Sequence, residues 1–131
     1  MKPKSSRAPA GSATSKVPRI ICGTDFSENA RQGSRAAAAI AKRLNEPALL
    51  VHALDFPRYA AESKAEVFRV VTASRRKSLH HEAESIRKTD VTVEMQLHPG
   101  RADEALVDLA RKGLTRLLVV ASLGRRGAER W

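Results

Sequence analysis

Apolar runs alternate along this chain with segments of helical periodicity, and this alternation constrains the fold more than any other feature. The runs are rich in leucine or β-branched residues and stop at turn residues, as strands do. We expect strands at 19–23, 48–54, 91–97 and 117–121. The order β-α-β-α-β-α-β that results predicts an α/β fold, a doubly wound parallel sheet with helices on both faces.

The run at 91–97 differs from the others because its apolar residues alternate with polar ones. The apolar positions are Val91, Val93, Met95 and Leu97. A period of two predicts a strand with one buried and one solvated face, which fits the edge of a sheet. We therefore predict the strand order 3-2-1-4. The runs at 48–54 and 117–121 are continuously apolar apart from His52, as in strands that are covered on both faces.

Two of the helical segments have clear limits. The first begins at Ser27, which can cap it, and ends before Asn45. Its predicted buried face consists of Ala30, Ala37, Ile40, Ala41 and Leu44. The last one ends at Gly113, which we expect to adopt a left-handed cap. Its predicted apolar face consists of Ala102, Ala105, Leu106, Leu109 and Ala110.

The segment at 59–88 is long, highly charged and less regular. Its apolar positions form a ragged helical stripe of Ala61, Ala65, Phe68, Leu79, Ala83 and Ile86. The β-branched run at 70–72 weakens the helix prediction there. We expect the charged residues at 75–77 and 80–84, Glu82 included, to form a solvated face. The adjacent histidines at 80 and 81 would point about 100° apart on a helix, so they do not suggest a shared metal ion.

The charge is uneven along the chain. The formal net charge is +10, with 24 Lys and Arg against 14 Asp and Glu. Such a charge permits an anionic partner but says nothing about the fold. Residues 1–18 contain no acidic residue and have no hydrophobic periodicity, so we predict a disordered basic tail there. Residues 19–131 would form the folded domain.

Composition argues against several classes of protein. No window approaches the roughly 18 consecutive apolar residues of a membrane span, so we expect a cytoplasmic protein with no membrane partner. Aromatic residues make up 4% of the chain, which argues against nucleic-acid binding by stacking. Cys22 is the single cysteine and lies in an apolar run, so we expect a small buried hydrophobe. The sequence suggests no metal site.

Two turns are candidate ligand sites, because ligands of doubly wound sheets bind at the carboxyl ends of the strands. Gly23-Thr24-Asp25 follows the first strand and offers a carboxylate, which suits ribose hydroxyls or an adenine amino group. The turn at 121–124 offers small residues, a hydroxyl and backbone N–H groups, which suit phosphate. Taken alone, the first pattern can equally be turn chemistry, with Asp25 capping the next helix.

Residues 19–28 read Arg-Ile-Ile-Cys-Gly-Thr-Asp-Phe-Ser-Glu and closely resemble the opening of universal stress proteins, where an apolar strand runs into Pro-Thr-Asp-Phe-Ser. The resemblance continues through Leu-Val-His-Ala at 50–53 and through 117–124, where the family has a hydrophobic strand followed by Met-Gly-Ser-His-Gly. It covers about 19–131, and its opening is the most specific part. It implies an adenine-nucleotide-binding α/β domain that is usually dimeric.

The resemblance also implies where a nucleotide such as ATP would bind. The matching positions are Thr24 and Asp25 in the adenosine-contacting turn, Ala53 at the end of the second strand, and Ala121, Ser122 and Gly124 in the phosphate loop, with Gly127 as the second glycine of a later Gly-x-x-Gly register. We prefer the register that begins at Ala121, because the later one lies three residues too far from the strand.

The chain departs from the family pattern at several places. Ala121 adds a methyl group where the family has a glycine against phosphate, and Gly23 replaces the usual proline. The final Gly-Ser/Thr of the signature would fall beyond Trp131, as would the usual last helix and fifth strand, so the domain looks truncated at its C-terminus. Weak or absent ATP binding is therefore expected, since several charge-assisted hydrogen bonds would be lost.

Two functional classes follow. The first is a universal stress protein, a non-catalytic and homodimeric stress-response module that binds an adenine nucleotide. The alternative is a basic interaction protein of the same fold that binds anionic partners without a nucleotide site. A serine hydrolase is excluded because no histidine follows Ser122, and Asp25 is the one candidate base for a slow nucleotide hydrolase. The apolar strand at 117–121 would have an exposed edge, which predicts dimerisation or aggregation there.

Overall fold

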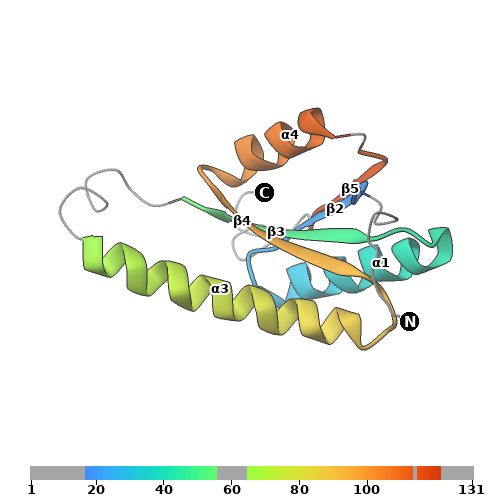
Figure 1. Ribbon diagram of the computed structural model, residues 1–131, viewed down its shortest axis with the longest axis horizontal. Helices are drawn as coiled ribbons and strands as arrows, with labels where there is room; N and C mark the ends of the chain where they lie inside the picture. Colours follow the sequence, from blue (N-terminus) through green and yellow to red (C-terminus); the bar gives the residue numbers. More distant parts are fainter. Residues whose placement is uncertain (1–16, 56–64, 114, 122–131) are drawn as a thin grey trace, which may run out of the picture.

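The computed structural model describes residues 17–55, 65–113 and 115–121. They form a four-stranded parallel sheet with helices on both faces (Figure 1). The strands are β2 (Ile20–Gly23), β3 (Ala48–Leu54), β4 (Val93–Pro99) and β5 (Leu117–Val119). Their order across the sheet is β4-β3-β2-β5. This confirms the α/β class and the predicted strand order 3-2-1-4.

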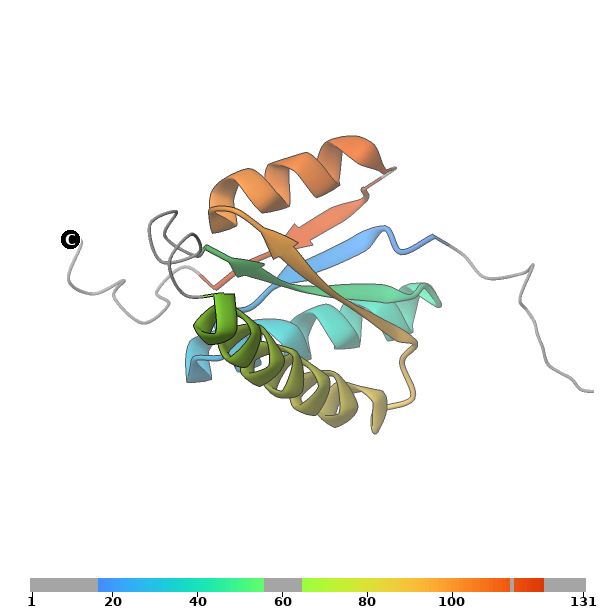
Figure 2. The ribbon, with the colours of Figure 1, turned by 60° about the vertical axis from the view of Figure 1, so that its left-hand side comes forward.

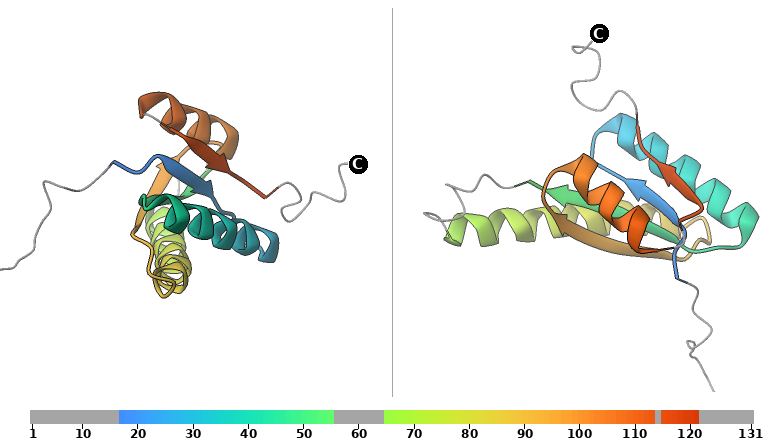
Figure 3. Two further views of the ribbon diagram at one scale, coloured as in Figure 1. Left: turned by 90° about the vertical axis from the view of Figure 1, so that its right-hand side faces the viewer. Right: turned by 90° about the horizontal axis from the view of Figure 1, so that it is seen from above.

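The described helices divide between the two faces of the sheet. They are α1 (Glu28–Leu44), α3 (Ala65–Arg87) and α4 (Ala102–Lys112). Helices α1 and α3 lie side by side on one face (Figure 2), and α4 lies on the other (Figures 1 and 3). Right-handed crossovers explain this division: the chain winds outward from β2 to β4 and then returns past β2 to β5, so the returning helix covers the opposite face.

The reversal of winding falls between β2 and β5, which are neighbours in the sheet. Ile20 pairs with Leu117 and Cys22 with Val119, while Gly23 at the end of β2 pairs with Val51 of β3. All these strands run in parallel, so their carboxyl ends meet at one edge of the sheet. A doubly wound sheet binds its ligands at this point.

Strand β4 lies at the edge of the sheet, as its alternating sequence predicts. Val93 is buried and Glu94 is exposed, because α3 covers one face of β4 while α4 lies over β2 and β3. The prediction that Met95 is buried was wrong, since 37% of this residue is exposed. An edge strand has a neighbour on one side only, so its side chains have fewer atoms to pack against.

The main core lies between the sheet and helices α1 and α3. Its largest fully buried side chains include Ile20, Leu50 and Leu79. Helix α1 turns small residues toward the sheet, namely Ala30, Ser34, Ala37, Ala38 and Ala41. The prediction that Ile40 and Leu44 belong to this face was wrong, because they are 37% and 41% exposed. Ile40 lies about 100° around the helix from the centre of the small-residue stripe, and Leu44 is the last helical residue.

Helix α3 is continuous through the β-branched run at 70–72. Its C-terminal half is buried through Leu79, Ala83 and Ile86. Its N-terminal half extends past the end of the sheet (Figure 1), where Ala65 is exposed and Phe68 is 36% exposed. The predicted burial of these two residues was therefore wrong, since no sheet lies beneath them. Ala61, the first residue of the predicted stripe, lies outside the described residues.

Helix α4 packs less deeply than its sequence suggests. Ala105 is its one buried residue, and Ala102 is exposed. Gly113 is extended, with φ −119°, so the prediction of a left-handed cap was wrong. Left-handed backbone occurs instead at Gly100, with φ 106°, in the turn before α4.

The predicted tail at 1–18 lies almost wholly outside the described residues, which begin at Val17. Val17 is largely exposed and leads directly into β2. Within the described part of the chain, no helix is both long and apolar enough to cross a membrane.

Candidate functional site

The turn that follows β2 is held by its own side chains. The Thr24 N–H donates to the Val51 carbonyl oxygen at 2.9 Å, which extends the pairing of β2 with β3. The Thr24 hydroxyl accepts from the Phe26 N–H at 3.0 Å. Asp25 Oδ1 accepts from the Ser27 N–H at 2.9 Å. Side chains that bond to backbone N–H groups one or two residues on are a standard way to fix such a turn.

The sequence left two interpretations of Asp25 open, a residue that forms the turn and a residue that contacts a ligand. The structure has features of both. Asp25 Oδ1 forms the turn with Ser27, so turn chemistry is part of its role. Ser27, rather than Asp25, is the cap of α1, because the Ser27 hydroxyl accepts the Ala30 N–H at 3.1 Å. Asp25 also lines a cavity at the strand ends. Turn formation therefore does not exclude a ligand contact.

Phe26 has an unusual backbone conformation, with φ 68°. Few bulky residues adopt this left-handed region. The Phe26 ring stacks on His52, with the ring centroids 4.3 Å apart. His52 Nδ1 lies 2.8 Å from the Thr24 carbonyl oxygen, and since a carbonyl can only accept, Nδ1 carries the proton. Burial lowers the pKa of His52, although its bond to Thr24 acts in the opposite direction. A strained backbone held in this way often marks a functional site.

A cavity of about 150 Å³ opens at the carboxyl ends of the strands, and we call it the strand-end cavity. Four residues that the sequence singled out line it together: Thr24, Asp25, Ala53 and Ala121. They come from the turn after β2, the end of β3 and the segment after β5. Most of the other walls are apolar. Ser122, Gly124 and Gly127, the remaining predicted residues, lie outside the described residues.

Gly23 forms a tight part of this cavity. A Cβ atom at this position would lie 3.0 Å from Leu106 Cδ1 and 3.5 Å from Val120 Cγ1. The first distance is shorter than ordinary contacts, so a larger residue would displace Leu106 or close the cavity. Glycine thus allows α4 to approach the end of β2.

Cys22 lies directly before this turn and is buried. Burial raises the pKa of its thiol to about 12, and the charge of Glu82 adds to the effect. The thiol therefore stays protonated and serves as a small hydrophobe, as the sequence predicts. In the described part of the chain, no three His, Cys, Asp or Glu side chains come together to hold a metal ion.

The model of the universal stress protein family matches residues 16–131. The chain belongs to the universal stress protein family. No curated relative matches it by sequence. The family assignment agrees with the strand order, with the Thr-Asp turn and with the position of the strand-end cavity.

Solved universal stress proteins have similar folds. One, crystallised in complex with cAMP, is 25% identical, with a TM-score of 0.62 over 79% of this chain and 75% of its own. The protein UspA from Lactobacillus plantarum is 15% identical, with a TM-score of 0.74 over 88% and 86%. A universal stress protein from Archaeoglobus fulgidus is 21% identical, with a TM-score of 0.62 over 80% and 76%. The last two likenesses show the fold alone.

One residue that supports the candidate site, Glu82, was not predicted from the sequence. We expected it on a solvated face, but it is only 7% exposed. Its Oε1 accepts the Thr24 hydroxyl at 3.0 Å, so α3 supports the turn from behind. The signal was present, because Leu79, Glu82, Ala83 and Ile86 follow the i, i+3, i+4, i+7 spacing of one buried helical face.

Glu82 is also electrostatically unusual. Burial raises its pKa, and the hydroxyls of Thr24 and Ser34 and the charge of Arg31 oppose this effect. Its second carboxylate oxygen, Oε2, is buried and has no hydrogen-bond partner among the described residues. A buried acceptor without a partner is costly to the folded state.

Proposed function

We propose that this universal stress protein is a non-catalytic stress-response module that binds an adenine nucleotide in the strand-end cavity. One observation carries the proposal: Thr24, Asp25, Ala53 and Ala121, which lie apart in the sequence, line a single cavity at the reversal point of the sheet. The likeness to a universal stress protein crystallised with cAMP supports it.

The walls of the cavity suit the nucleoside end of such a ligand. Asp25 supplies a carboxylate, which accepts hydrogen bonds from ribose hydroxyls or an adenine amino group. Ala53 and Ala121 leave room for a flat base, and Leu106 and Val120 provide apolar contact. At about 150 Å³ the cavity is smaller than most complete ligand pockets. It would therefore hold the base or the ribose, with the phosphate extending beyond it.

We expect an adenine nucleotide with a single phosphate, such as cAMP or AMP, to bind more tightly than ATP. Ala121 places a methyl group where a glycine would let the backbone approach phosphate. Each charge-assisted hydrogen bond that is lost removes about 1.5–3 kcal/mol. A ligand with one phosphate loses fewer of them than a ligand with three.

The absence of catalysis is part of the proposal. Asp25 is the one carboxylate among the described residues that line the cavity, and its Oδ1 already accepts the Ser27 N–H. His52 points its proton at the Thr24 carbonyl oxygen, so it is engaged behind the turn. Neither group is arranged as a general base for an attacking water.

Calorimetry with cAMP, AMP and ATP tests this proposal. We expect saturable binding of cAMP or AMP, and at least tenfold weaker binding of each by Asp25→Asn, which keeps an oxygen for the turn but removes the charge. Glu94→Gln is the matched control, because Glu94 is an exposed carboxylate on β4. Nucleotide binding that Asp25→Asn leaves unchanged would contradict the site. The absence of any adenine-nucleotide binding would favour the alternative of a basic interaction protein.

We also propose that the protein forms a homodimer through β5. Among the described residues β5 pairs with β2 alone, and Leu118 of β5 and Val120, which follows β5, are 39% and 53% exposed. An open apolar edge favours pairing with a second chain. Sedimentation at increasing concentration should give a dimer, or aggregates at low salt. A stable monomer at high concentration and moderate salt would contradict this proposal.

A further inference from the structure

A second hollow, the α1–α3 groove, lies between the two helices that cover the same face of the sheet (Figure 2). Its volume is about 500 Å³, which is within the usual range for small-molecule sites. From α1 it is lined by Arg31, Ser34 and Arg35, from α3 mainly by Lys77, His81, Glu82 and Glu84, and just past the end of α3 by Lys88. Glu82 lies on the buried face of α3, whereas Lys77 and Lys88 are exposed at the rim of the groove.

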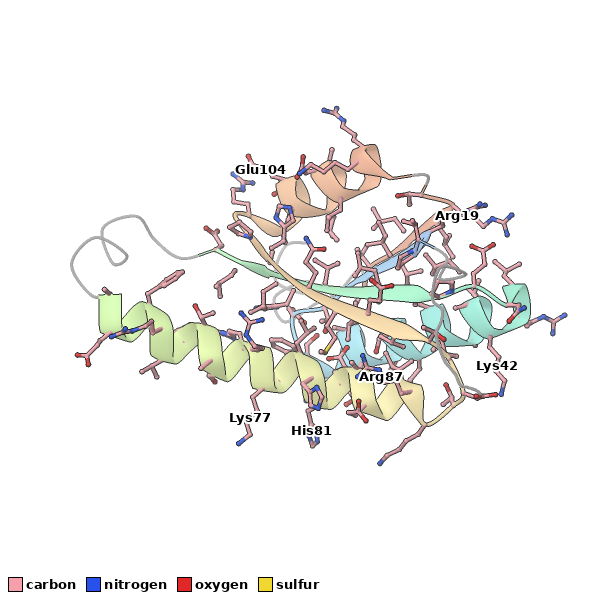
Figure 4. All side chains as sticks on the ribbon, in the orientation of Figure 1. Arg19, Lys42, Lys77, His81, Arg87 and Glu104 are labelled. Carbon is pink, nitrogen blue, oxygen red and sulfur yellow. The ribbon has the colours of Figure 1, made fainter. Side chains whose placement is uncertain are left out.

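The rim of the α1–α3 groove carries more positive than negative charge. On α1, Glu28 lies 3.4 Å from Arg31 and 3.8 Å from Arg35, so these guanidinium groups share one exposed carboxylate. Neither Lys77 of α3 nor Lys88, which follows the last residue of α3, forms an ion pair with any described residue. Figure 4 shows Lys77 and His81 projecting from the same side of α3. Arg and Lys side chains that line one hollow favour a phosphate group.

Glu82 gives the α1–α3 groove a buried acceptor of opposite charge. Glu82 is only 7% exposed and lines the groove. Oε1 is engaged by Thr24, whereas Oε2 has no partner among the described residues. The neighbouring Ser34 hydroxyl donates to the Arg31 carbonyl oxygen at 2.9 Å. A ligand with an N–H donor would satisfy this oxygen.

We propose that the α1–α3 groove is a second ligand site, separate from the strand-end cavity, for a small phosphate-bearing molecule with an ammonium group. Arg31 and Arg35 on one side of the groove, with Lys77 or Lys88 on the other, hold the phosphate. Glu82 Oε2 accepts a hydrogen bond from the ammonium group, because the Thr24 hydroxyl occupies only Oε1. A molecule with one group alone binds more weakly, because it leaves either the buried acceptor or the surrounding cations without a partner.

Nuclear magnetic resonance of the ¹⁵N-labelled full chain tests this proposal, with phosphoethanolamine as the probe. We expect saturable shifts in the backbone amides of Ser34, Lys77, Glu82 and Ser85, which line the groove. Inorganic phosphate and ethanolamine, each carrying one of the two groups, should bind at least tenfold more weakly. Equal affinity for phosphoethanolamine and inorganic phosphate, or shifts spread over other cationic surfaces, would mean non-specific ion binding and would overturn the proposal.

Variants separate the two groups of the site. Glu82→Gln keeps an oxygen for Thr24 but places an amide in the groove, so it should abolish the preference for phosphoethanolamine over phosphate. The double variant Lys77→Ala, Lys88→Ala should weaken the binding of phosphoethanolamine and of inorganic phosphate at least tenfold. It changes only exposed residues. Lys42→Ala, an exposed lysine at the other end of α1 (Figure 4), is the control and should change neither. If Glu82→Gln does not fold, the lysine variant decides, and unchanged binding by it would overturn the proposal.

Asp25→Asn distinguishes this site from the proposed nucleotide site. Asp25 lines the strand-end cavity and does not line the α1–α3 groove. Phosphoethanolamine should therefore bind this variant as it binds the natural chain. A large loss of phosphoethanolamine binding would place the probe in the strand-end cavity and contradict a second site.

Discussion

The strand-end cavity and the α1–α3 groove lie on either side of one turn, and they differ in almost every other respect. The cavity is small, about 150 Å³, and has mainly apolar walls, whereas the groove is about 500 Å³ and is lined by cations around a buried carboxylate. The position of the cavity follows from backbone topology, because any doubly wound sheet opens at its reversal point. The groove depends on which side chains two neighbouring helices present to each other.

Thr24 joins the two regions. It lines the strand-end cavity, and its hydroxyl donates to Glu82, which lines the α1–α3 groove. The same hydroxyl accepts the Phe26 N–H. One buried threonine therefore supports two chemically different hollows. Substitutions at and around Thr24 should separate the contribution of the strand-end cavity from that of the α1–α3 groove.

The largest effect is expected from Thr24→Val, which keeps the shape but removes the hydroxyl. The Glu82 carboxylate would lose its one donor from the turn and the Phe26 N–H its acceptor. Leaving buried polar groups without partners costs about 2–3 kcal/mol of unfolding free energy. Urea denaturation measures this loss. Thr92→Val, at an exposed threonine before β4, is the control and should change stability by less than about 0.5 kcal/mol. Equal stability of the two variants would show that the Thr24–Glu82 bond does not support the turn.

The next effect is a pH dependence that belongs to the groove side alone. Burial raises the pKa of Glu82 above its ordinary value of 4.5. Between 4.5 and the raised value the folded chain holds a proton that the unfolded chain has lost, so stability falls as pH rises through this window. Glu82→Gln lacks this loss, so its stability relative to the natural chain should increase with pH across the window. Urea denaturation of both proteins from pH 4 to pH 8 measures it, and a constant difference would contradict a raised pKa.

The smallest effect belongs to the cavity side. In Gly23→Ala the new methyl group would lie 3.0 Å from Leu106 Cδ1. We expect a loss of about 1 kcal/mol from overpacking, together with weaker nucleotide binding because the cavity narrows. Adding Leu106→Ala makes room, so the double variant should be more stable than the sum of the two single losses predicts. Simple additivity in thermal or urea denaturation would show that the two residues do not share this contact.

The sequence predicted those parts of the molecule that depend on local pattern and topology. Alternation of apolar runs with helices gave the parallel sheet and its order, and the period of two placed β4 at the edge. Thr24 and Asp25 could be identified because a strand that ends in a turn must place its next residues at the sheet edge. Ala121 belongs to the second turn that the sequence singled out, Ala53 came from the family resemblance, and the structure brings all four to one cavity.

The errors lie where burial depends on how far one element extends over another. Phe68 has a large apolar side chain, as core residues do, but it lies on the part of α3 that extends past the sheet (Figure 1). Ile40 lies on the flank of α1, because small residues form the face in contact with the sheet. Glu82 was assigned to solvent from its charge, although its spacing with Leu79 and Ile86 placed it on the buried face. Charge indicates exposure only when no buried partner such as Thr24 is available.

One titration tests the central claim, that the strand-end cavity binds the nucleotide and the groove does not. Backbone amides of the ¹⁵N-labelled full chain would be followed by nuclear magnetic resonance as cAMP is added. Saturable shifts are predicted at Gly23, Asp25, Ala53 and Ala121, with the amides of the groove residues Lys77 and Lys88 unchanged. Shifts confined to Lys77, Lys88 and their neighbours, with the four cavity residues unmoved at saturation, would contradict the claim.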